Sequence, residues 1–363
     1  MGNVLAWERR VAVVCHLVEG ASVNATARMT GVSKPTILSL LLQSGEGCDR
    51  IHDARVHSLA IRDVEIDELW SFIQKKQRRV GPADPPHWGD AYAFLAMART
   101  QKLLIAYRVG KRDEQNTRAF VADLRARLAV VPAITSDGFT AYPTAVGESF
   151  AIDGQAGAAV DYVVLLKEFN GRRFKDDSVR YEPPREPVMH KRGVYGAPDL
   201  DRASTSHIER ANLTVRMHIR RFTRLCNGYS KSLPHHKAAV SLHVAFYNWC
   251  RVHETLRVTP AMEAGLTDHV WTVDELLREA LGAPVQEKPR VRPLRLPDPG
   301  TAKELPGGRG WLRAVPSTGK AGAGPTAAPT PPRPPEAPAV RPVAAPRRRW
   351  VQMDLFGWKP PEK

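Results

Sequence analysis

Cysteine is scarce in this sequence, and its amino-terminal stretch lacks an unbroken apolar run. The cysteines form no Cys-x-x-Cys pair, so neither a disulfide framework nor a cysteine zinc site is indicated. Charged residues interrupt the first twenty positions, which excludes a secretory signal or a membrane span there. We therefore expect a cytoplasmic protein with reduced thiols and no membrane partner. The four cysteines are Cys15, Cys48, Cys226 and Cys250.

Acidic residues are outnumbered by basic ones. The chain of 363 residues has 53 Lys+Arg against 38 Asp+Glu, a formal net charge of +15. A surplus of this size makes an anionic polymer, above all DNA, the first partner to consider. Residues 283–363 hold 18 of the 30 prolines and 15 Lys+Arg against 6 Asp+Glu. We expect this basic, proline-rich tail to be disordered, so the charge argument is weaker for the rest of the chain.

The first 45 residues carry the pattern of a helix-turn-helix domain. Gly31 fits the turn, Ser33 fits the N-cap of the next helix, and Pro35 fits its first turn. Residues 33–42 would then be a recognition helix for the major groove, with Ser33, Lys34 and Thr36 as DNA contacts. The alternative is an ordinary three-helix packing unit. Residues 46–60, with scattered glycines and charges, are expected to form an irregular linker.

Residues 61–270 alternate between strand and helix patterns. Three strands forming an antiparallel meander are followed by helix, strand, helix, strand and a final helix, which is the element order of the ribonuclease-H-like fold. The final helix is expected over Thr205–Arg224, with an apolar stripe of Ile208, Ala211, Val215, Ile219 and Phe222. A further amphipathic helix at 234–251 is expected to cover the sheet. We therefore predict an α/β domain with a mixed five-stranded sheet and flanking helices. Residues 168–203 lack any period and are expected to form an inserted arm or loop outside the sheet.

Three acidic residues are predicted to meet in this fold. Asp67 lies within one strand, Asp137 ends another, and Glu209 opens a helix that would cross both. Carboxylates so close repel one another, and two Mg²⁺ ions, or Mn²⁺ in their place, would relieve this repulsion. Two such ions support in-line phosphoryl transfer. We therefore predict that Asp67, Asp137 and Glu209 are catalytic and bind the metal.

Simpler interpretations exist for this acidic group. Ser206 and Glu209 fit the S-x-x-E capping box of a helix start. Glu65 shares the strand face of Asp67 and is the alternative ligand, whereas Glu68 is expected to be solvated. The histidines at 235, 236 and 253 are expected to be structural or surface groups.

Four sequence blocks resemble the insertion-sequence-one family of DDE transposases. The blocks are DELWSF at 67–72, SDGFTAY at 136–142, SHIERANLTVRMHIRRFTRLCNGYSKS at 206–232 and FYNWCRVHETLRVTPAMEAGL at 246–266. The resemblance covers about residues 60–270 and implies that Asp67, Asp137 and Glu209 are the family's catalytic triad. The amino-terminal cysteine zinc finger that family members often carry has no counterpart in this sequence.

The resemblance implies a function in the bacterial cytosol or nucleoid. The expected activity is metal-dependent cleavage at transposon ends and transfer of the 3′-hydroxyl into target DNA, by a homo-oligomer that holds two ends together. Its double-stranded substrates would be the terminal repeats and the target. The alternatives are a catalytically silent DNA-binding repressor and a ribonuclease-H-like nuclease or resolvase. The expected DNA contacts near the third acid are Arg210, Arg216, Arg220, Arg221 and Arg224.

An apolar island lies near the end of the basic tail. QMDLF, at 352–356, resembles the peptide by which bacterial DNA enzymes dock on the replicative sliding clamp. Gln352, Leu355 and Phe356 would be its anchors. A docking peptide works best on a flexible tether, and an apolar end without function is the alternative.

Overall fold

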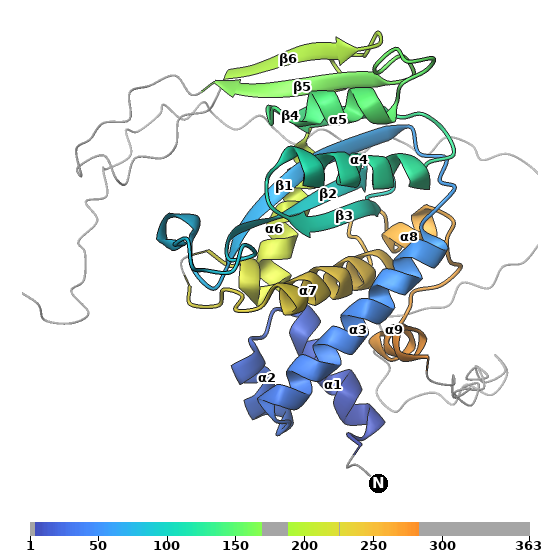
Figure 1. Ribbon diagram of the computed structural model, residues 1–363. Helices are drawn as coiled ribbons and strands as arrows, with labels where there is room; N and C mark the ends of the chain where they lie inside the picture. The colour runs from blue at the N-terminus through green and yellow to red at the C-terminus, as the bar shows by residue number, and fades with distance from the viewer. Residues whose placement is uncertain (1–3, 169–187, 225, 283–363) are drawn as a thin grey trace, which may run out of the picture. The chain divides into compact units, whose positions relative to one another are not determined.

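Six strands form a single mixed sheet in the computed structural model, which describes residues 4–168, 188–224 and 226–282. Their order is β3-β2-β1-β4-β5-β6 (Figure 1). β2 runs antiparallel to β1 and β3, while β4 and β5 run parallel to β1. The first five strands thus have the ribonuclease-H-like order, and the predicted α/β class is confirmed. The strands are β1 (Asp63–Ile73), β2 (Gly89–Ala98), β3 (Leu104–Gly110), β4 (Ala133–Asp137), β5 (Asp161–Glu168) and β6 (Val188–Tyr195).

The sixth strand corrects the predicted sheet of five. β6 pairs antiparallel with β5, from Tyr162↔Tyr195 to Glu168↔Val188, so part of the predicted 168–203 arm belongs to the sheet. Most of β6 is exposed. An edge strand pairs through its backbone along one side and needs no buried apolar face, so the sequence lacks the usual alternation. The middle of the predicted arm, 169–187, lies outside the described residues.

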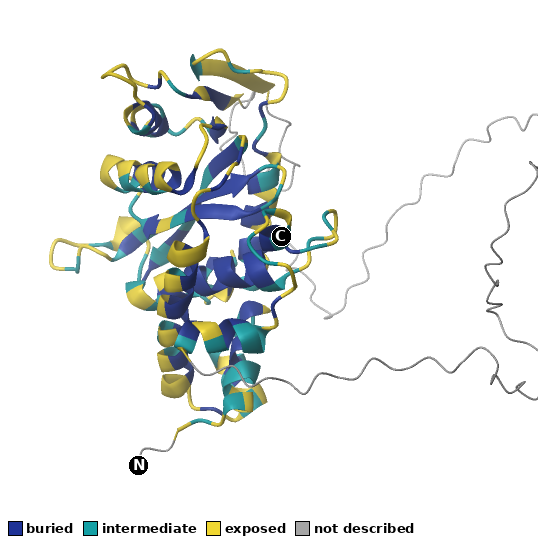
Figure 2. Ribbon diagram, turned by 90° about the vertical axis from the view of Figure 1, so that its right-hand side faces the viewer, coloured by how far each residue is buried: buried dark blue, intermediate teal, exposed yellow. Residues whose placement is uncertain are grey.

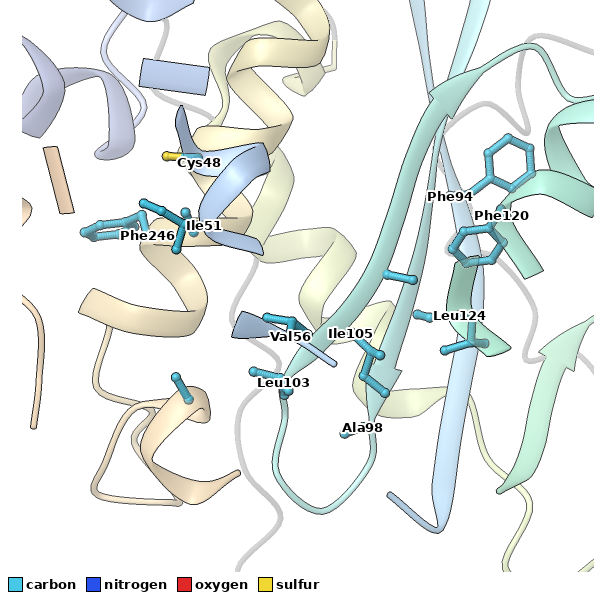
Figure 3. Close-up of a cluster of buried hydrophobic side chains, with 14 of the residues drawn as sticks. Cys48, Ile51, Val56, Phe94, Ala98, Leu103, Ile105, Phe120, Leu124 and Phe246 are labelled. Atoms are coloured by element: carbon cyan, nitrogen blue, oxygen red, sulfur yellow. The ribbon is translucent and has the colours of Figure 1, made fainter. Parts of the chain in front are cut away.

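Helices cover both faces of the sheet (Figures 1 and 2). On one face, Phe120 and Leu124 of α4 pack against the sheet, with the Phe120 ring 5.7 Å from that of Phe94 (Figure 3). On the other face, the predicted apolar stripe of α6 is buried, from Ile208 to Val215. Both helical layers follow from apolar residues repeating every three or four positions. The layers contain α4 (Glu114–Arg127), α5 (Tyr142–Ser149), α6 (Ser206–His218), η3 (Arg220–Phe222) and α7 (Leu233–Ala245).

The chain begins with three helices that include the predicted turn. Gly31 ends α2 in the left-handed region at φ 66°, a conformation that glycine adopts without strain. Ser33 caps α3 by accepting a hydrogen bond from the Thr36 amide at 3.4 Å, and Pro35 lies in the first turn. The cap prediction is therefore confirmed. These helices are α1 (Trp7–Val18), α2 (Val23–Thr30) and α3 (Lys34–Arg55).

The irregular linker predicted for 46–60 is wrong over most of its length, because α3 continues to Arg55. Gly45 and Gly47 act as contact points rather than helix breakers. A Cβ at Gly45 would meet Ala238 Cα at 2.5 Å, and one at Gly47 would meet the Ala280 carbonyl oxygen at 2.0 Å. Glycine is required here for close helix packing. Cys48 and Ile51 of α3 and Val56, which follows the helix, belong to one buried core, in which Val56 lies beside Leu103 and Ile51 beside Phe246 (Figure 3).

The carboxyl-terminal helices complete this packing. The helix predicted at 234–251 is present as α7 and the π-helical turn η4, and Val240 and Val244 pack on the sheet as predicted. Trp7 Nε1 donates to Asp274 Oδ1 at 2.5 Å, joining the two ends of the described chain. None of the described helices is both long and apolar enough to cross a membrane. The remaining elements are η1 (Gln77–Arg79), η4 (Phe246–Cys250), α8 (Pro260–Glu263) and α9 (Val273–Leu281).

Candidate functional site

The two predicted strand acids lie side by side at the carboxyl end of β4. The parallel register of β1 and β4 ends at Ile66↔Ser136, so Asp67 and Asp137 each follow the last paired residue. β4 stops at Asp137, whereas β1 continues to Ile73. Side chains on both faces of β1 therefore reach the space beyond the end of β4. Ligand sites of open α/β sheets commonly lie at such carboxyl ends.

A third carboxylate joins this pair, and it belongs to Glu68. One carboxylate oxygen from each of Asp67, Glu68 and Asp137 lies within 4.8 Å of the other two. The prediction that Glu68 is solvated is wrong, because its side chain is only 4% exposed. Glu68 accepts hydrogen bonds from the Tyr142 hydroxyl at 2.9 Å and from Arg112 Nε at 2.7 Å. The one sequence signal for a role of Glu68 was its position next to Asp67. Strand alternation places neighbouring residues on opposite faces, which led to the wrong prediction that Glu68 is solvated.

The pKa values of two carboxylates in this cluster, Asp67 and Glu68, are strongly raised. Burial and the charge of Asp137 raise the pKa of Asp67 to about 7, with Glu209 adding to the effect. Burial and Asp137 also raise the pKa of Glu68 to about 7, although Arg112 and the Tyr142 hydroxyl oppose the change. The cause is a set of like charges in a partly desolvated place. A bound divalent cation would relieve this repulsion, so the cluster is electrostatically suited to one.

Glu209, the third predicted ligand, lies at the edge of this cluster and is exposed. Its Oε1 accepts from Lys167 Nζ of β5 at 2.5 Å and from Thr205 Oγ1 at 2.9 Å. Glu209 is near enough to raise the pKa of Asp67, and Lys167 is near enough to lower it. Among the described residues, the three acids that lie close together are thus Asp67, Asp137 and Glu68, whereas the predicted third member was Glu209. No sequence pattern had indicated Lys167.

The start of α6 is capped from the sheet. The capping box predicted for Ser206 and Glu209 is not formed, and the N-cap residue is Thr205. Instead, Glu65 Oε2 accepts from the amides of His207 and Ile208, each at 2.9 Å. Glu65 Oε1 also accepts from His207 Nδ1 at 2.7 Å. Glu65 does share the strand face of Asp67 as predicted, but its carboxylate holds α6 rather than joining the acidic cluster.

Asn212 links α6 to the acidic cluster. Its Nδ2 donates to Asp67 Oδ2 at 2.6 Å, while its Oδ1 is buried without a hydrogen-bond partner among the described residues. Carboxylate and amide oxygens are the donors that Mg²⁺ and Mn²⁺ prefer. The residues present therefore fit a divalent cation held by Asp67, Glu68 and Asp137. Asn212 lies three residues after Glu209, a helical spacing that would have marked it as a neighbour.

The predicted DNA-contacting arginines lie on α6, on η3 and, for Arg224, just beyond η3. The predicted continuous helix through 224 is wrong, because α6 ends at His218 and Ile219 adopts extended φ and ψ of −111° and 102°. Ile219 and Phe222 are both buried in the core beneath the sheet, which requires the chain to turn here. Arg210 and Arg216 remain on α6, whereas Arg220 and Arg221 lie on the turn η3. Of the five, Arg210, Arg220 and Arg224 are exposed, and Arg216 and Arg221 are half-buried.

The other predicted contact residues lie in two places. Ser33, Lys34 and Thr36 are exposed at the start of α3, and the Ser33 and Thr36 hydroxyls are hydrogen-bonded to each other at 2.8 Å. Their role in DNA binding stays a prediction. The predicted clamp-docking residues Gln352, Leu355 and Phe356 and the predicted disordered tail lie outside the described residues.

Comparison with known proteins gives distant structural similarity only. No protein-family model and no curated protein matches the sequence. Among solved structures, the chain is similar to a piggyBac transposase synaptic complex with hairpin DNA, at 11% identity and a TM-score of 0.35, over 76% of this chain and 69% of that one. It is also similar to the Mos1 strand transfer complex, at 14% identity and a TM-score of 0.17, over 41% and 57% of the two chains. A Mos1 mariner paired-end complex with Mn gives 14% identity and a TM-score of 0.18, over 41% and 58%. Similarity this distant carries no argument about the site, whose interpretation rests on the topology and side chains of this chain.

Proposed function

We propose that the chain is a DDE transposase that cuts DNA at transposon ends and joins the 3′-hydroxyl to target DNA. The observation that carries the proposal is the meeting of Asp67 and Asp137 where the pairing of the parallel strands β1 and β4 ends, with Glu209 on α6, which packs on β1. The resemblance of this chain's motifs to the insertion-sequence-one family supports the same three residues. The expected assembly is a homo-oligomer, because two transposon ends must be held together.

Divalent metal is part of the proposal. Asp67 and Asp137 would hold two Mg²⁺ ions, or Mn²⁺ in their place, together with Glu209 and with Glu68 from the opposite face of β1. When bound, such ions neutralise the charge that develops at the attacking and leaving oxygens of a phosphoryl transfer. For Glu209 to take part, its carboxylate has to exchange the Lys167 ammonium for the metal. Asn212 would keep Asp67 oriented through the 2.6 Å hydrogen bond to its Oδ2.

The substrate would be double-stranded DNA. Arg210 and Arg216 lie one and seven residues beyond Glu209, and both would contact phosphates beside the acidic cluster. Burial lowers the pKa of Arg216, and its Nε lacks a hydrogen-bond partner in the described part of the chain. A phosphate oxygen is the acceptor that such a guanidinium lacks. Phosphate contacts of this kind position the duplex without reading its sequence.

A cleavage and joining assay tests the proposal. The substrate is a supercoiled plasmid carrying the DNA that flanks the gene, with Mg²⁺ or Mn²⁺ and labelled target DNA. We expect Asp67→Asn, Asp137→Asn and Glu209→Gln each to reduce joined product about 100-fold or more, because each loses a metal ligand. Glu263→Gln, which changes an exposed carboxylate on α8, is the control and should keep full activity.

The DNA products of this assay distinguish a transposase from a nuclease or resolvase and from a repressor. Cut DNA without joined product would identify a nuclease or resolvase, and wild-type protein that binds DNA but is as inactive as Glu209→Gln would identify a repressor. Either result would contradict the transposase proposal. Comparison of Glu68→Gln with Glu209→Gln assigns the third ligand. Full activity of Glu209→Gln, with loss in Glu68→Gln, would replace Glu209 by Glu68 in the triad.

A further inference from the structure

A pocket of about 550 Å³ lies away from the acidic cluster, between the amino-terminal helices, η3 and α7. α1 to α3 contribute one side, including Val18, Lys34 and Leu38. The segment from His218 to His243 contributes the other. Figure 1 shows α1, α2 and α3 on the side of the sheet that α6 and α7 cover. The volume is within the usual range for pockets that bind small molecules and cofactors.

The charges around this pocket are all of one sign. Four cations line it, namely Lys34, Arg220, Arg221 and Lys231, and its lining includes no aspartate or glutamate. Three of the four were predicted DNA contacts from separate parts of the sequence. The fold brings them to a single concave surface. A concave basic site attracts an anion more strongly than the same charges spread over a convex surface.

Arg221 is the most desolvated of these cations. Burial lowers its pKa to about 10, and no carboxylate counters the effect. Its hydrogen bond to Ser230 Oγ is long, at 3.4 Å, and that hydroxyl also bonds His236 Nδ1 at 2.7 Å. A desolvated guanidinium without a carboxylate is costly, and a bound anion would offset the cost. A phosphate, which accepts two parallel hydrogen bonds from arginine, suits it best.

Apolar and aromatic side chains form part of the remaining walls, beside serine, asparagine and histidine side chains. Leu38 and Leu41 of α3 and Ala239 and Leu242 of α7 are among the lining residues. Tyr229 adds an aromatic ring that is held by stacking on Phe72, with ring centroids 4.9 Å apart. Inorganic phosphate would leave these walls uncovered. The pocket therefore suits a ligand that carries a phosphate and a flat apolar group together.

We propose that this pocket binds one nucleotide unstacked from a DNA strand, with its phosphate on Arg221 and its base between α3 and α7. The inference rests on the proposed function only in taking DNA as the polymer that supplies the nucleotide. Lys34 and Lys231, both exposed at the rim, contact the neighbouring phosphates. The pocket thus holds the strand away from the acidic cluster, on surfaces of the amino-terminal helices, η3 and α7.

Binding of a single-stranded oligonucleotide tests the inference without catalysis. A fluorescein-labelled 12-residue DNA is titrated with full-length protein in EDTA, and its anisotropy gives the dissociation constant. Ala239→Phe fills the pocket, and the double variant Lys34→Ala/Lys231→Ala removes its rim charges. We expect each to weaken binding about five-fold or more, the loss of one stacked base or of two phosphate contacts. Lys237→Ala, an exposed cation on α7 outside this pocket, should bind within about two-fold of wild type.

Competition identifies the ligand. Deoxyadenosine monophosphate should displace the oligonucleotide from wild type at concentrations about ten-fold below those of inorganic phosphate, because phosphate gains nothing from the apolar walls. Wild-type affinity of Ala239→Phe, or equal competition by the two compounds, would overturn the inference. Circular dichroism and thermal unfolding confirm that each variant is folded. Asp67→Asn should bind like wild type, so a failure of the catalytic proposal is distinguishable from a failure of this one.

Discussion

Lys167 decides the charge around Glu209 more than any other single residue. Its ammonium lies 2.5 Å from Glu209 Oε1, and it also lowers the pKa of Asp67. A cation of the chain itself is thus paired with Glu209, a carboxylate that the proposed metal site would use. Like charges repel, so Lys167 and a divalent cation compete for the same carboxylates.

Removing this ammonium should strengthen metal binding. We expect Lys167→Ala to raise the affinity for Mn²⁺ by about two- to five-fold, since a half-exposed ion pair contributes on the order of 1 kcal/mol or less. Isothermal titration calorimetry with Mn²⁺ measures the change. Lys237→Ala serves as the matched control, and its affinity should equal that of wild type. A weaker affinity in Lys167→Ala would show that the lysine supports the site instead of competing for it.

At the scale of elements, β1 has two functions on one strand. Its residues 67 and 68 contribute carboxylates to the acidic cluster, while Glu65 caps α6 across the sheet face. Glu65 is only 1% exposed. Because α6 carries Glu209 and Asn212, the cap also positions these two side chains relative to Asp67.

Loss of this cap should destabilise the fold. Glu65→Ala leaves the amides of His207 and Ile208 without their acceptor, and we expect the free energy of unfolding to fall by about 2–3 kcal/mol. Urea denaturation measures this change. Glu114→Ala, at an exposed carboxylate on α4, should change the free energy of unfolding by less than about 0.5 kcal/mol. Equal stabilities of the two variants would mean that water replaces Glu65 at the helix start.

Across the whole molecule, three histidines are buried in the helical layers, and two of them are hydrogen-bonded to strands of the sheet. His52 Nε2 donates a hydrogen bond to the Ile105 carbonyl oxygen, 2.9 Å away, and His236 lies between the hydroxyls of Ser71 and Ser230. His243 has no hydrogen-bond partner at either ring nitrogen among the described residues. Burial lowers the pKa of each to about 3, with nearby cations adding to the effect. The structural role predicted for His236 agrees with these contacts.

These histidines should make the fold sensitive to acid. Each binds a proton in the unfolded chain below its ordinary pKa of 6.5 but stays neutral in the folded chain until about pH 3. The unfolded state therefore binds more protons between these limits, and stability falls as the pH falls, by about 1 kcal/mol per pH unit for each histidine. Asp67 and Glu68 act in the opposite direction, because their raised pKa values let the folded state bind protons below about pH 7.

A single substitution isolates the contribution of one histidine to the pH dependence of the free energy of unfolding. We expect His243→Leu to lose less stability than wild type between pH 7 and pH 4.5, since it removes one group that must stay neutral in the fold. Urea denaturation across this range gives both slopes, and the contributions of the two acids cancel in the difference. Identical slopes would show that His243 is protonated in the folded protein.

The sequence by itself determined the order of the first five strands and the helices between them, and the faces that β1 and α6 bury. Strand alternation placed Glu65 and Asp67 on one face of β1, and three- to four-residue spacing marked the buried stripe of α6, because both patterns depend on local geometry alone. Only the tertiary structure decided the length of α3, the sixth strand, the cap of α6 by Glu65 and the place of Glu68 among the acids. In the sequence, Gly45 and Gly47 look like helix breakers, but in the fold Ala238 and Ala280 pack closely against them. β6 is held in the sheet by backbone hydrogen bonds to β5, so its side chains need no strand pattern. Each of these features depends on a partner distant in the chain, which no local pattern records.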